Sequence, residues 1–218
     1  KYHNGNAFTA DDVVFSIARV NGEQSDMNTY VGTVKEVKKV DANTVDFLLE
    51  APVPILLRNI IDFRIMSKSW AEKNKSEKVQ NYAAREDTYA SRNANGTGPY
   101  ILKEWAPDQR IVLAANPAWW DKREGNVRDV VYSPIKADAT RVAALLSGDV
   151  DIVIDLPTQD VARLRQNTSL KVLEGHEVRT IFIGMDQFSE ELAGSSVKGK
   201  NPFKDVRVRK ALNLAVDR

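Results

Sequence analysis

The sequence predicts an α/β protein in which helices and antiparallel strands are mixed. Residues 10–20 carry apolar side chains at the spacing of one helix face. Residues 34–49 and 100–114 each alternate apolar and polar positions on both sides of a turn, which is typical of hairpins with one buried face. Residues 127–156 are predicted as a strand, a helix and a second strand, a β-α-β pattern.

The first helix has a clear start and stop in the sequence. Thr9 is followed three residues later by Asp12, the approximate spacing of a capping box, and Asn21 with Gly22 supplies a C-terminal stop. The apolar stripe expected to face the core consists of Val13, Val14, Ile17 and Val20.

The chain then continues with a hairpin and short elements. Strands at 34–40 and 45–49 flank a turn at 41–43, where Asp and Asn side chains suit an Asx turn. A short apolar helix is expected around 55–61, and 63–66 is predicted as a further strand.

Residues 71–93 are polar and charge-rich, which indicates surface helix and loop and a first domain boundary. After the second hairpin at 100–114, we expect a helix at 139–147 that is capped by Asp138 and ended by Gly148. The other expected elements are strands at 127–135, 150–156, 170–173 and 180–185 and a helix at 158–166.

Composition excludes several classes of protein. The 218 residues include no cysteine, which rules out disulfide scaffolds, thiol catalysis and cysteine-based metal sites. The chain has 31 Lys and Arg residues and 30 Asp and Glu residues, so its net charge does not favour a polyanionic partner. No apolar run approaches the ~20 residues that span a bilayer. His3 and His176 are the only imidazoles and no serine lies in a G-x-S-x-G context, so we expect no catalytic residues.

Two further motifs are expected to be structural. Asp149, Asp151 and Asp155 have the carboxylates of a cation site, but on a strand the last two would stand about 13 Å apart at ~3.3 Å per residue. Residues 96–99, Gly-Thr-Gly-Pro, lack the spacing and lysine of a phosphate-binding loop and are predicted as a tight turn. We therefore expect no bound metal and no cofactor.

One strong basic run lies between Lys198 and Lys210, and such runs can contact phosphates. Phe203 is its only aromatic residue, whereas base stacking needs several, so we favour a solvated helix face over a nucleic-acid surface. The apolar residues expected to point inward from this helix are Val206, Val208, Leu212, Leu214 and Val216.

Aromatic residues concentrate within about twenty positions, at Tyr100, Trp105, Trp119 and Trp120. They suit the wall of a pocket for a small organic ligand or, alternatively, a turn at 116–120 that fills the core. We favour the core-filling turn.

Four segments carry a resemblance to a known family. They are KYHNGNAFTADDVVFSIARV, GTGPYILKEW with the following NPAWW, RVAALLSGDVDIV, and NPFKDVRVRKALNLAVDR. In this order they cover nearly the whole chain, which resembles the family 5 extracellular solute-binding proteins that serve ABC importers. The departures within these blocks are small and lie at Asn4, Asn6, Ala7 and Trp119.

The resemblance implies a periplasmic-binding-protein-like (type II) lobe, with a mixed sheet, flanking helices and an incomplete second lobe. By this analogy residues 1–93 form an extra subdomain of lobe one, and 94–186 form part of its central sheet domain. Residues 187–200 are then a linker, and 201–218 the truncated first helix of lobe two. The chain lacks an initiator Met and a signal segment, so we expect an internal piece of a longer protein.

The resemblance also implies a function in transport and not in catalysis. The expected role is capture of a peptide or similar small solute between two lobes, and its delivery to the permease subunits of an ABC transporter. The protein is expected in the periplasm, or outside a Gram-positive cell and tethered to its membrane, without spanning it. We expect a monomer when complete, while the piece could dimerise through an exposed sheet edge. The alternatives are an interaction or chaperone-like module on the same fold and, third, a hydrolase.

Ligand-contacting residues are suggested in two places. Four lie at the end of the strand that, in the resemblance, approaches the crossover between lobes, and two are aromatic residues that suit a cleft wall. For each of them a structural role is the alternative that we favour. These candidates are Tyr30, Tyr100, Thr180, Phe182, Met185 and Asp186.

Overall fold

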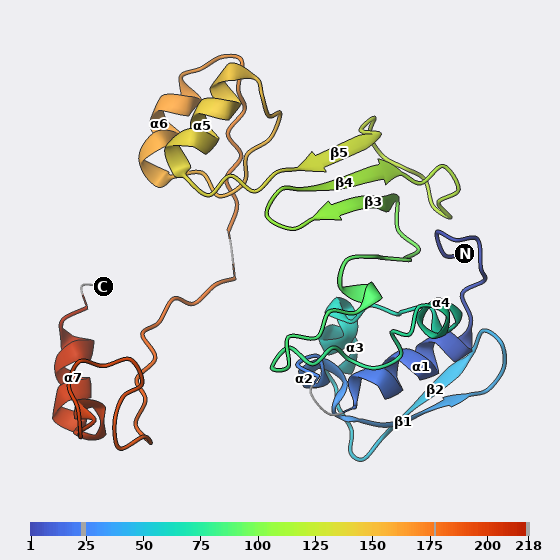
Figure 1. The fold of residues 1–218 in the computed structure, drawn as a ribbon, viewed down its shortest axis with the longest axis horizontal. Coiled ribbons are helices and arrows are strands. Elements are labelled where there is room, and N and C mark those ends of the chain that lie inside the picture. Colours follow the sequence, from blue (N-terminus) through green and yellow to red (C-terminus); the bar gives the residue numbers. More distant parts are fainter. Residues whose placement is uncertain (23–24, 177, 217–218) are drawn as a thin grey trace. The chain divides into compact units, whose positions relative to one another are not determined.

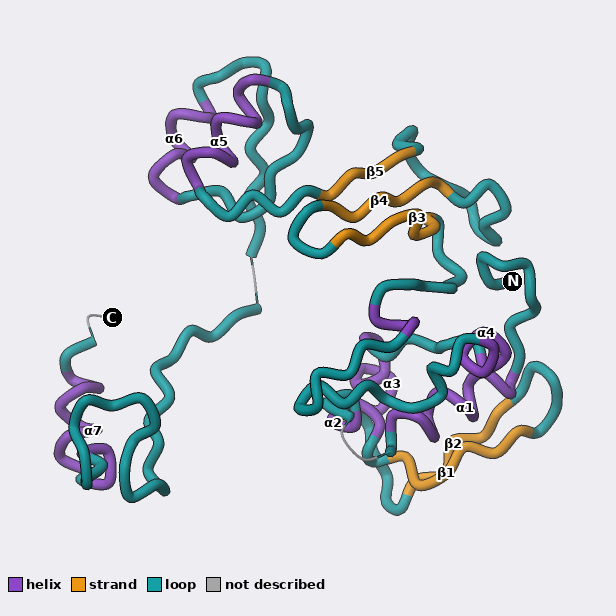
Figure 2. Tube along the Cα trace, in the orientation of Figure 1, coloured by secondary structure: helices purple, strands orange, loops and turns teal. Residues whose placement is uncertain are grey.

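The computed structural model describes residues 1–22, 25–176 and 178–216 and divides the chain into two compact units, Lys1–Ile154 and Asp155–Arg218. Figure 1 labels the elements of each unit, and Figure 2 distinguishes their helices from their strands. Within the described residues, every strand belongs to the first unit, and the regular elements of the second are helical.

The first half of unit 1 contains one long helix, one hairpin and several short helices. Its elements are α1 (Ala10–Val20), α2 (Asn28–Val31), β1 (Val34–Lys39), β2 (Val45–Leu49), α3 (Leu56–Asn59), η1 (Ile60–Asp62), α4 (Lys68–Lys73) and η2 (Tyr89–Ser91). The second half contains β3 (Tyr100–Ala106), β4 (Arg110–Ala115), β5 (Asp129–Tyr132) and α5 (Asp138–Ser147).

α1 begins and ends where the sequence predicts. Thr9 is the N-cap residue, and its backbone amide donates to the Asp12 carboxylate at 2.8 Å. The Thr9 hydroxyl donates to the same carboxylate at 3.3 Å, so a single acid satisfies two donors at the helix start. Asn21 follows as the C-cap residue.

The core of this region forms where α1 packs on the first hairpin. Ile17 and Val20 of α1, Val31 of α2 and Val34 of β1 make one buried cluster. Each such side chain contributes about 1.5–3 kcal/mol when fully buried. Partly buried residues surround the cluster, namely Met27, Tyr30, Val37, Phe47, Leu49, Leu56, Ile60 and Phe63. Val13 and Val14, the other members of the predicted stripe, are only half-buried.

The hairpin itself is confirmed. β1 pairs antiparallel with β2, and Lys39 lies opposite Val45 at the turn end. The Asn43 amide donates to Asp41 Oδ1 at 2.7 Å, the Asx interaction that the turn residues predict.

A polar stripe on α1 binds the segment around α4. Asp12 is 5% exposed, and its Oδ1 accepts the backbone amide of Lys68, the first residue of α4, at 2.8 Å. One turn further along α1, Ser16 Oγ accepts from the Met66 amide at 2.9 Å and donates to the Met66 carbonyl at 3.1 Å. The Arg19 guanidinium then donates to backbone carbonyls of residues 76 and 78. The stripe thus satisfies backbone groups of a segment that runs past the helix.

The prediction of a strand at 63–66 was wrong, and the polar stripe on α1 explains why. The segment is not part of a sheet. At Met66 both backbone groups are satisfied by the Ser16 hydroxyl, so a side chain takes the place of a neighbouring strand.

The second sheet has the order β3-β4-β5 and is antiparallel throughout. Tyr100 lies opposite Ala115, and Ala106 lies opposite Arg110, as expected for the second hairpin. The predicted strand at 127–135 is shorter than expected and forms only over β5. No residue of these three strands is fully buried, so both sheet faces stay partly open in the described part of the chain.

α5 differs from the prediction at its start. The N-cap is Ala137, and Asp138 is the first helical residue, with its Oδ1 accepting from the Arg141 guanidinium at 2.6 Å. Asp138 therefore acts through an i,i+3 ion pair in the first turn and not as a cap. At the other end, Gly148 adopts a φ of 82°, the left-handed C-cap that the sequence predicts.

Three predicted strands do not form. Residues 150–156, 170–173 and 180–185 have no strand assignment, so the expected β-α-β unit is also absent from the described residues. Ile152 is 79% exposed and Ile181 is 88% exposed, which shows that their apolar side chains meet no packing partner. These segments have strand-forming residues, but a strand also needs a hydrogen-bonding neighbour, and none is present in the described part.

Unit 2 contains α6 (Thr158–Arg165), η3 (Pro202–Lys204) and α7 (Val206–Leu214). α6 matches the predicted helix, and α7 begins at a well-formed cap, where the Arg207 amide donates to Asp205 Oδ1 at 2.8 Å. The prediction that the apolar residues of α7 point inward was wrong, because Leu214 is 86% exposed and Val206 is 50% exposed.

The Asp12 contacts lead to a stability prediction. Asp12→Ala removes the acceptor for two backbone amides and leaves both N–H groups unsatisfied at helix starts. We expect the free energy of unfolding to fall by about 3 kcal/mol in urea denaturation, since hydrogen bonds to charged groups contribute ~1.5–3 kcal/mol each. Asp11→Ala is the matched control, because Asp11 is exposed and pairs only with Lys39 at 2.7 Å. That change should cost less than about 1 kcal/mol, and equal losses would contradict the assigned role.

Candidate functional site

Three of the sequence motifs meet at one junction in unit 1. The His3 amide donates to the Gly96 carbonyl at 2.8 Å, and the Gly96 amide lies 3.3 Å from His3 Nδ1, which accepts it. His3 Nε2 lies 3.0 Å from the Gly98 carbonyl. With Nδ1 accepting, Nε2 carries the proton and donates. His3 thus fastens the N-terminal segment to the loop before β3.

The opposite side of the same loop is held by the Asn-Pro-Ala-Trp-Trp segment. Asn116 Nδ2 donates to the Gly98 carbonyl at 3.2 Å, and the Asn116 amide donates to the Pro99 carbonyl at 2.7 Å. Trp120 Nε1 donates to the Thr97 carbonyl at 3.1 Å. The loop at 96–99 is therefore a structural turn, as predicted. Its Thr97 and Gly98 carbonyls accept from side chains, and its Gly96 and Pro99 carbonyls accept from backbone amides.

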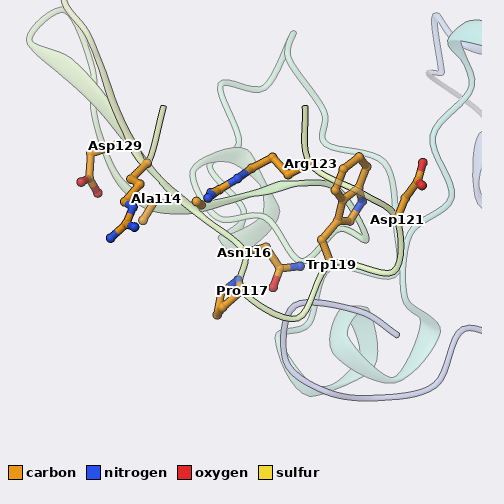
Figure 3. Close-up of a pocket in the computed structure, with 9 residues that line it drawn as sticks. Ala114, Asn116, Pro117, Trp119, Asp121, Arg123 and Asp129 are labelled. Atoms are coloured by element: carbon orange, nitrogen blue, oxygen red, sulfur yellow. The ribbon is translucent and has the colours of Figure 1, made fainter. Parts of the chain in front are cut away.

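A pocket of about 540 Å³ opens beside this junction (Figure 3). Its lining comes from the end of β4, the turn after it, the following loop and the start of β5. In the view of Figure 3, Arg123 extends across the pocket between Trp119 and the strand end at Ala114. The lining residues are Ala114, Ala115, Asn116, Pro117, Trp119, Asp121, Arg123, Arg128 and Asp129.

The two tryptophans of this turn do not fill a core, which corrects the interpretation favoured from the sequence. Trp120 is 70% exposed, and Trp119 lines the pocket. Their rings contact each other edge to face, with centroids 5.8 Å apart. For Trp119, therefore, the alternative interpretation applies, in which the aromatic residues form the wall of a pocket. Sequence reasoning missed Arg123 and Arg128, since isolated arginines in a loop give no signal.

Two of the predicted site residues lie in unit 1 and have structural contacts there. Tyr30 on α2 packs against the cluster of Ile17, Val20, Val31 and Val34. Tyr100 on β3 donates its hydroxyl to the Val127 carbonyl at 2.9 Å, which ties β3 to the chain before β5.

Three others lie in unit 2 and have no regular structure. Thr180 and Phe182 belong to an extended stretch, and the Phe182 ring is 79% exposed. Met185 is half-buried. Apolar side chains gather along this stretch, where Val178 and Ile183 are also exposed. The stretch therefore presents several exposed apolar side chains, with Arg179 and Thr180 between them.

Asp186, the sixth predicted residue, organises a turn. Its Oδ1 accepts the amides of Phe188 at 2.9 Å and Ser189 at 3.1 Å. Hydrogen bonds from the Ser189 hydroxyl, the Ser189 amide and the Phe188 amide lower the pKa of the Asp186 carboxyl. The nearly buried Asn201 donates to the carbonyls of Asp186 and Ser189, at 2.9 and 2.8 Å, and so connects the turn to η3.

The basic run around α7 has acidic partners. Lys198 pairs with Glu191 at 3.0 Å, and Lys204 pairs with Glu190. Arg209 donates to the carbonyls of Phe203 and Lys204 and so folds back on η3. Much of the positive charge of this run therefore has partners within unit 2, which agrees with the solvated helix face that we favoured.

Neither a cluster of metal ligands nor a membrane-spanning helix is present among the described residues. In the ranges 1–22, 25–176 and 178–216, no three His, Asp or Glu side chains gather closely enough to hold a metal ion. Over the same ranges, no helix has the length and apolar character needed to cross a membrane.

The His3 contacts predict a stability difference between the two histidines. His3→Ala removes both ring hydrogen bonds and leaves the Gly96 amide without its partner. We expect a loss of about 2 kcal/mol in the free energy of unfolding and faster hydrogen exchange at Gly96. His176→Ala, at an exposed position, should change stability by less than ~0.5 kcal/mol. If the two variants unfold alike, the junction does not depend on His3.

The Asp186 turn predicts a local pH dependence. The pKa of Asp186 is lowered in the folded chain, so the turn's contribution is present above the unfolded-state pKa and is lost as pH falls through the folded-state value. The amide resonances of Phe188 and Ser189 should therefore shift in acid, with a midpoint below the usual range for aspartate. In Asp186→Asn the transition should vanish. A transition that persists in this variant would assign it to another group.

Comparisons with known proteins agree with the motif resemblance. The model of bacterial extracellular solute-binding proteins, family 5 Middle, matches residues 1–218. The dipeptide-binding protein of Escherichia coli K12 is 28% identical over 100% of this chain and 41% of its own length. Heme-binding protein A of Haemophilus influenzae is 30% identical over 100% of this chain and 40% of its own length. The chain thus spans about two fifths of these relatives.

Solved structures agree on the fold. NikZ from Campylobacter jejuni, in complex with Ni(L-His), superposes with a TM-score of 0.74 at 20% identity, over 99% of this chain and 40% of that one. AppA from Bacillus subtilis, in complex with a nonapeptide, gives a TM-score of 0.66 at 25% identity, over 78% of this chain and 33% of that one. The fold is that of a type II periplasmic binding protein, with mixed α and β elements. The chain belongs to the bacterial extracellular solute-binding proteins, family 5.

Proposed function

We propose that the protein containing this chain is the solute-binding component of an ABC importer, and that it captures a peptide or similar small solute. The observation that carries this proposal is the family match over residues 1–218. The names of the relatives support the ligand class, since they include a dipeptide-binding protein and two oligopeptide-binding proteins. The match to a family of solute-binding proteins supports a binding role.

The proposed organisation places most of this chain in lobe one. Residues 1–93 form the extra subdomain, 94–186 part of the central sheet domain, 187–200 a linker, and 201–218 the start of lobe two. The protein acts in the periplasm or outside the cell as a monomer, and it delivers the solute to permease subunits in the membrane. Solute-binding relatives with periplasmic names support this location.

The proposed ligand contacts come from the extended stretch in unit 2. Thr180 and Phe182 have exposed side chains that are free to meet a solute. Met185 lies next to them and is half-buried. Tyr30, Tyr100 and Asp186 have structural partners, and they contribute by holding their elements in place.

Calorimetric titration of the intact protein tests this function. A native-mass screen against mixed peptides first identifies a ligand, which is then titrated into the intact protein and into the chain 1–218 alone. A closed pocket covers ~70–90% of its ligand's surface. We therefore expect tight binding by the intact protein, and weak or no binding by the chain 1–218, which provides only one wall of the cleft. Equal affinities would place the whole site within these 218 residues and contradict capture between lobes.

A variant pair localises the contact. Phe182→Ala should weaken binding by the intact protein about tenfold or more, because an aromatic contact on the ligand is lost. Phe188→Ala is the matched control, since this ring is 93% exposed and lies beyond the proposed contact stretch. Equal effects of the two changes would remove Phe182 from the site.

A further inference from the structure

The pocket between β4 and β5 contains hydrogen-bond donors that have no partner. Trp119 Nε1 is buried and makes no hydrogen bond with any residue that the structure describes, whereas Nε1 of the neighbouring Trp120 donates to a carbonyl. The guanidinium groups of Arg123 and Arg128 form no ion pair or hydrogen bond with the described residues. Nearby on the same sheet, Arg110 does find an acid, pairing with Glu104 at 3.0 Å.

Unmet donors of this kind favour an anionic ligand. A buried N–H without an acceptor costs free energy that a ligand oxygen can recover. Guanidinium groups bind carboxylates through paired N–H donors, and these charge-assisted bonds are stronger than neutral ones. Three donor groups in the lining of one pocket therefore provide recognition for a carboxylate.

The rest of the lining adds the opposite charge. Asp121 and Asp129 also line the pocket, and the carboxylate of Asp129 has no partner among the described residues. Asp121 accepts only the amide of the next residue, at 2.7 Å. Two arginines and two aspartates give the lining a formal charge of zero, so a ligand with one carboxylate and one ammonium group matches it better than a simple anion.

The pocket also has the size and apolar surface that a small solute needs. Its volume of about 540 Å³ lies within the range of small-molecule sites, which is ~300–1,000 Å³. Trp119, Pro117 and the two alanines at the end of β4 supply an apolar wall beside the charged groups.

We propose that this pocket is a binding site for a small zwitterion of amino-acid size, with its carboxylate on Arg123 and Arg128 and its ammonium group on Asp129, which lies at the same strand end as Ala114 (Figure 3). The apolar side chain of the ligand lies against Trp119. The site contains none of the residues proposed for the solute cleft. A test of this site is therefore independent of the proposed import function.

Titration of the intact protein with L-leucine tests the proposal. The probe is the indole N–H resonance of Trp119 in NMR, identified by its loss in Trp119→Phe. L-leucine should shift this resonance. N-acetyl-L-leucine, without the ammonium group, and L-leucinamide, without the carboxylate, should each bind about tenfold more weakly, because each lacks one of the two charge contacts.

Matched variants locate the contacts. Arg123→Gln and Arg128→Gln should each weaken L-leucine binding about tenfold, since glutamine keeps hydrogen-bonding capacity but removes the charge. Arg58→Gln is the control, because Arg58 is an exposed arginine on α3 outside the pocket lining. All three variants are surface changes and should keep the parent's thermal midpoint.

Three outcomes would overturn the site. The first is no shift of the Trp119 resonance at about 10 mM L-leucine, tenfold above a millimolar Kd. The second is equal binding of L-leucine and its two charge-deleted analogues. The third is an equal effect of Arg58→Gln and the two pocket variants.

Discussion

The Asp12 carboxylate fixes how the first half of unit 1 is assembled. It is almost completely buried, and a buried charge persists only when hydrogen bonds replace its water. Its two oxygens accept backbone amides at the starts of α1 and α4, through Thr9 and Lys68. Ser16 and Arg19 continue the same face, while Ile17 on the other side enters the core. A rotation of α1 would lose the polar contacts and the apolar packing together.

Sequence reasoning succeeded where the interaction is local. The Thr9–Asp12 cap, the Asp41–Asn43 turn and the Gly148 C-cap each depend on residues that are close in sequence. It failed where a distant side chain decides the structure. Ser16 lies 50 residues from Met66, and no pattern within 63–66 indicates that a hydroxyl, and not a strand, will satisfy that backbone. The pocket was missed for a different reason: its lining lies close in sequence, between Ala114 and Asp129, but its arginines are in a loop without a regular pattern.

The motifs that identify the family are mainly framework residues. His3 and Asn116 hold the loop at 96–99, Asp12 joins two helix starts, and Asn201 binds the turn at Asp186. Each has a hydrogen-bonding role that another residue type would not reproduce at the same distances. A sequence can therefore reveal its family through these residues while the proposed ligand contacts lie at other positions.

The proposed ligand contacts lie where local sequence determines position least. Each strand that forms in the described residues pairs with the strand next to it in sequence, so a turn delivers its hydrogen-bonding partner. Thr180 and Phe182 lie in a stretch with the same strand-forming composition but without such a neighbour. β-propensity reflects packing against neighbouring strands more than an intrinsic backbone preference. We therefore expect the placement of these two side chains to depend on a partner distant in sequence, and the proposed solute contact to depend on the interaction that orders this stretch.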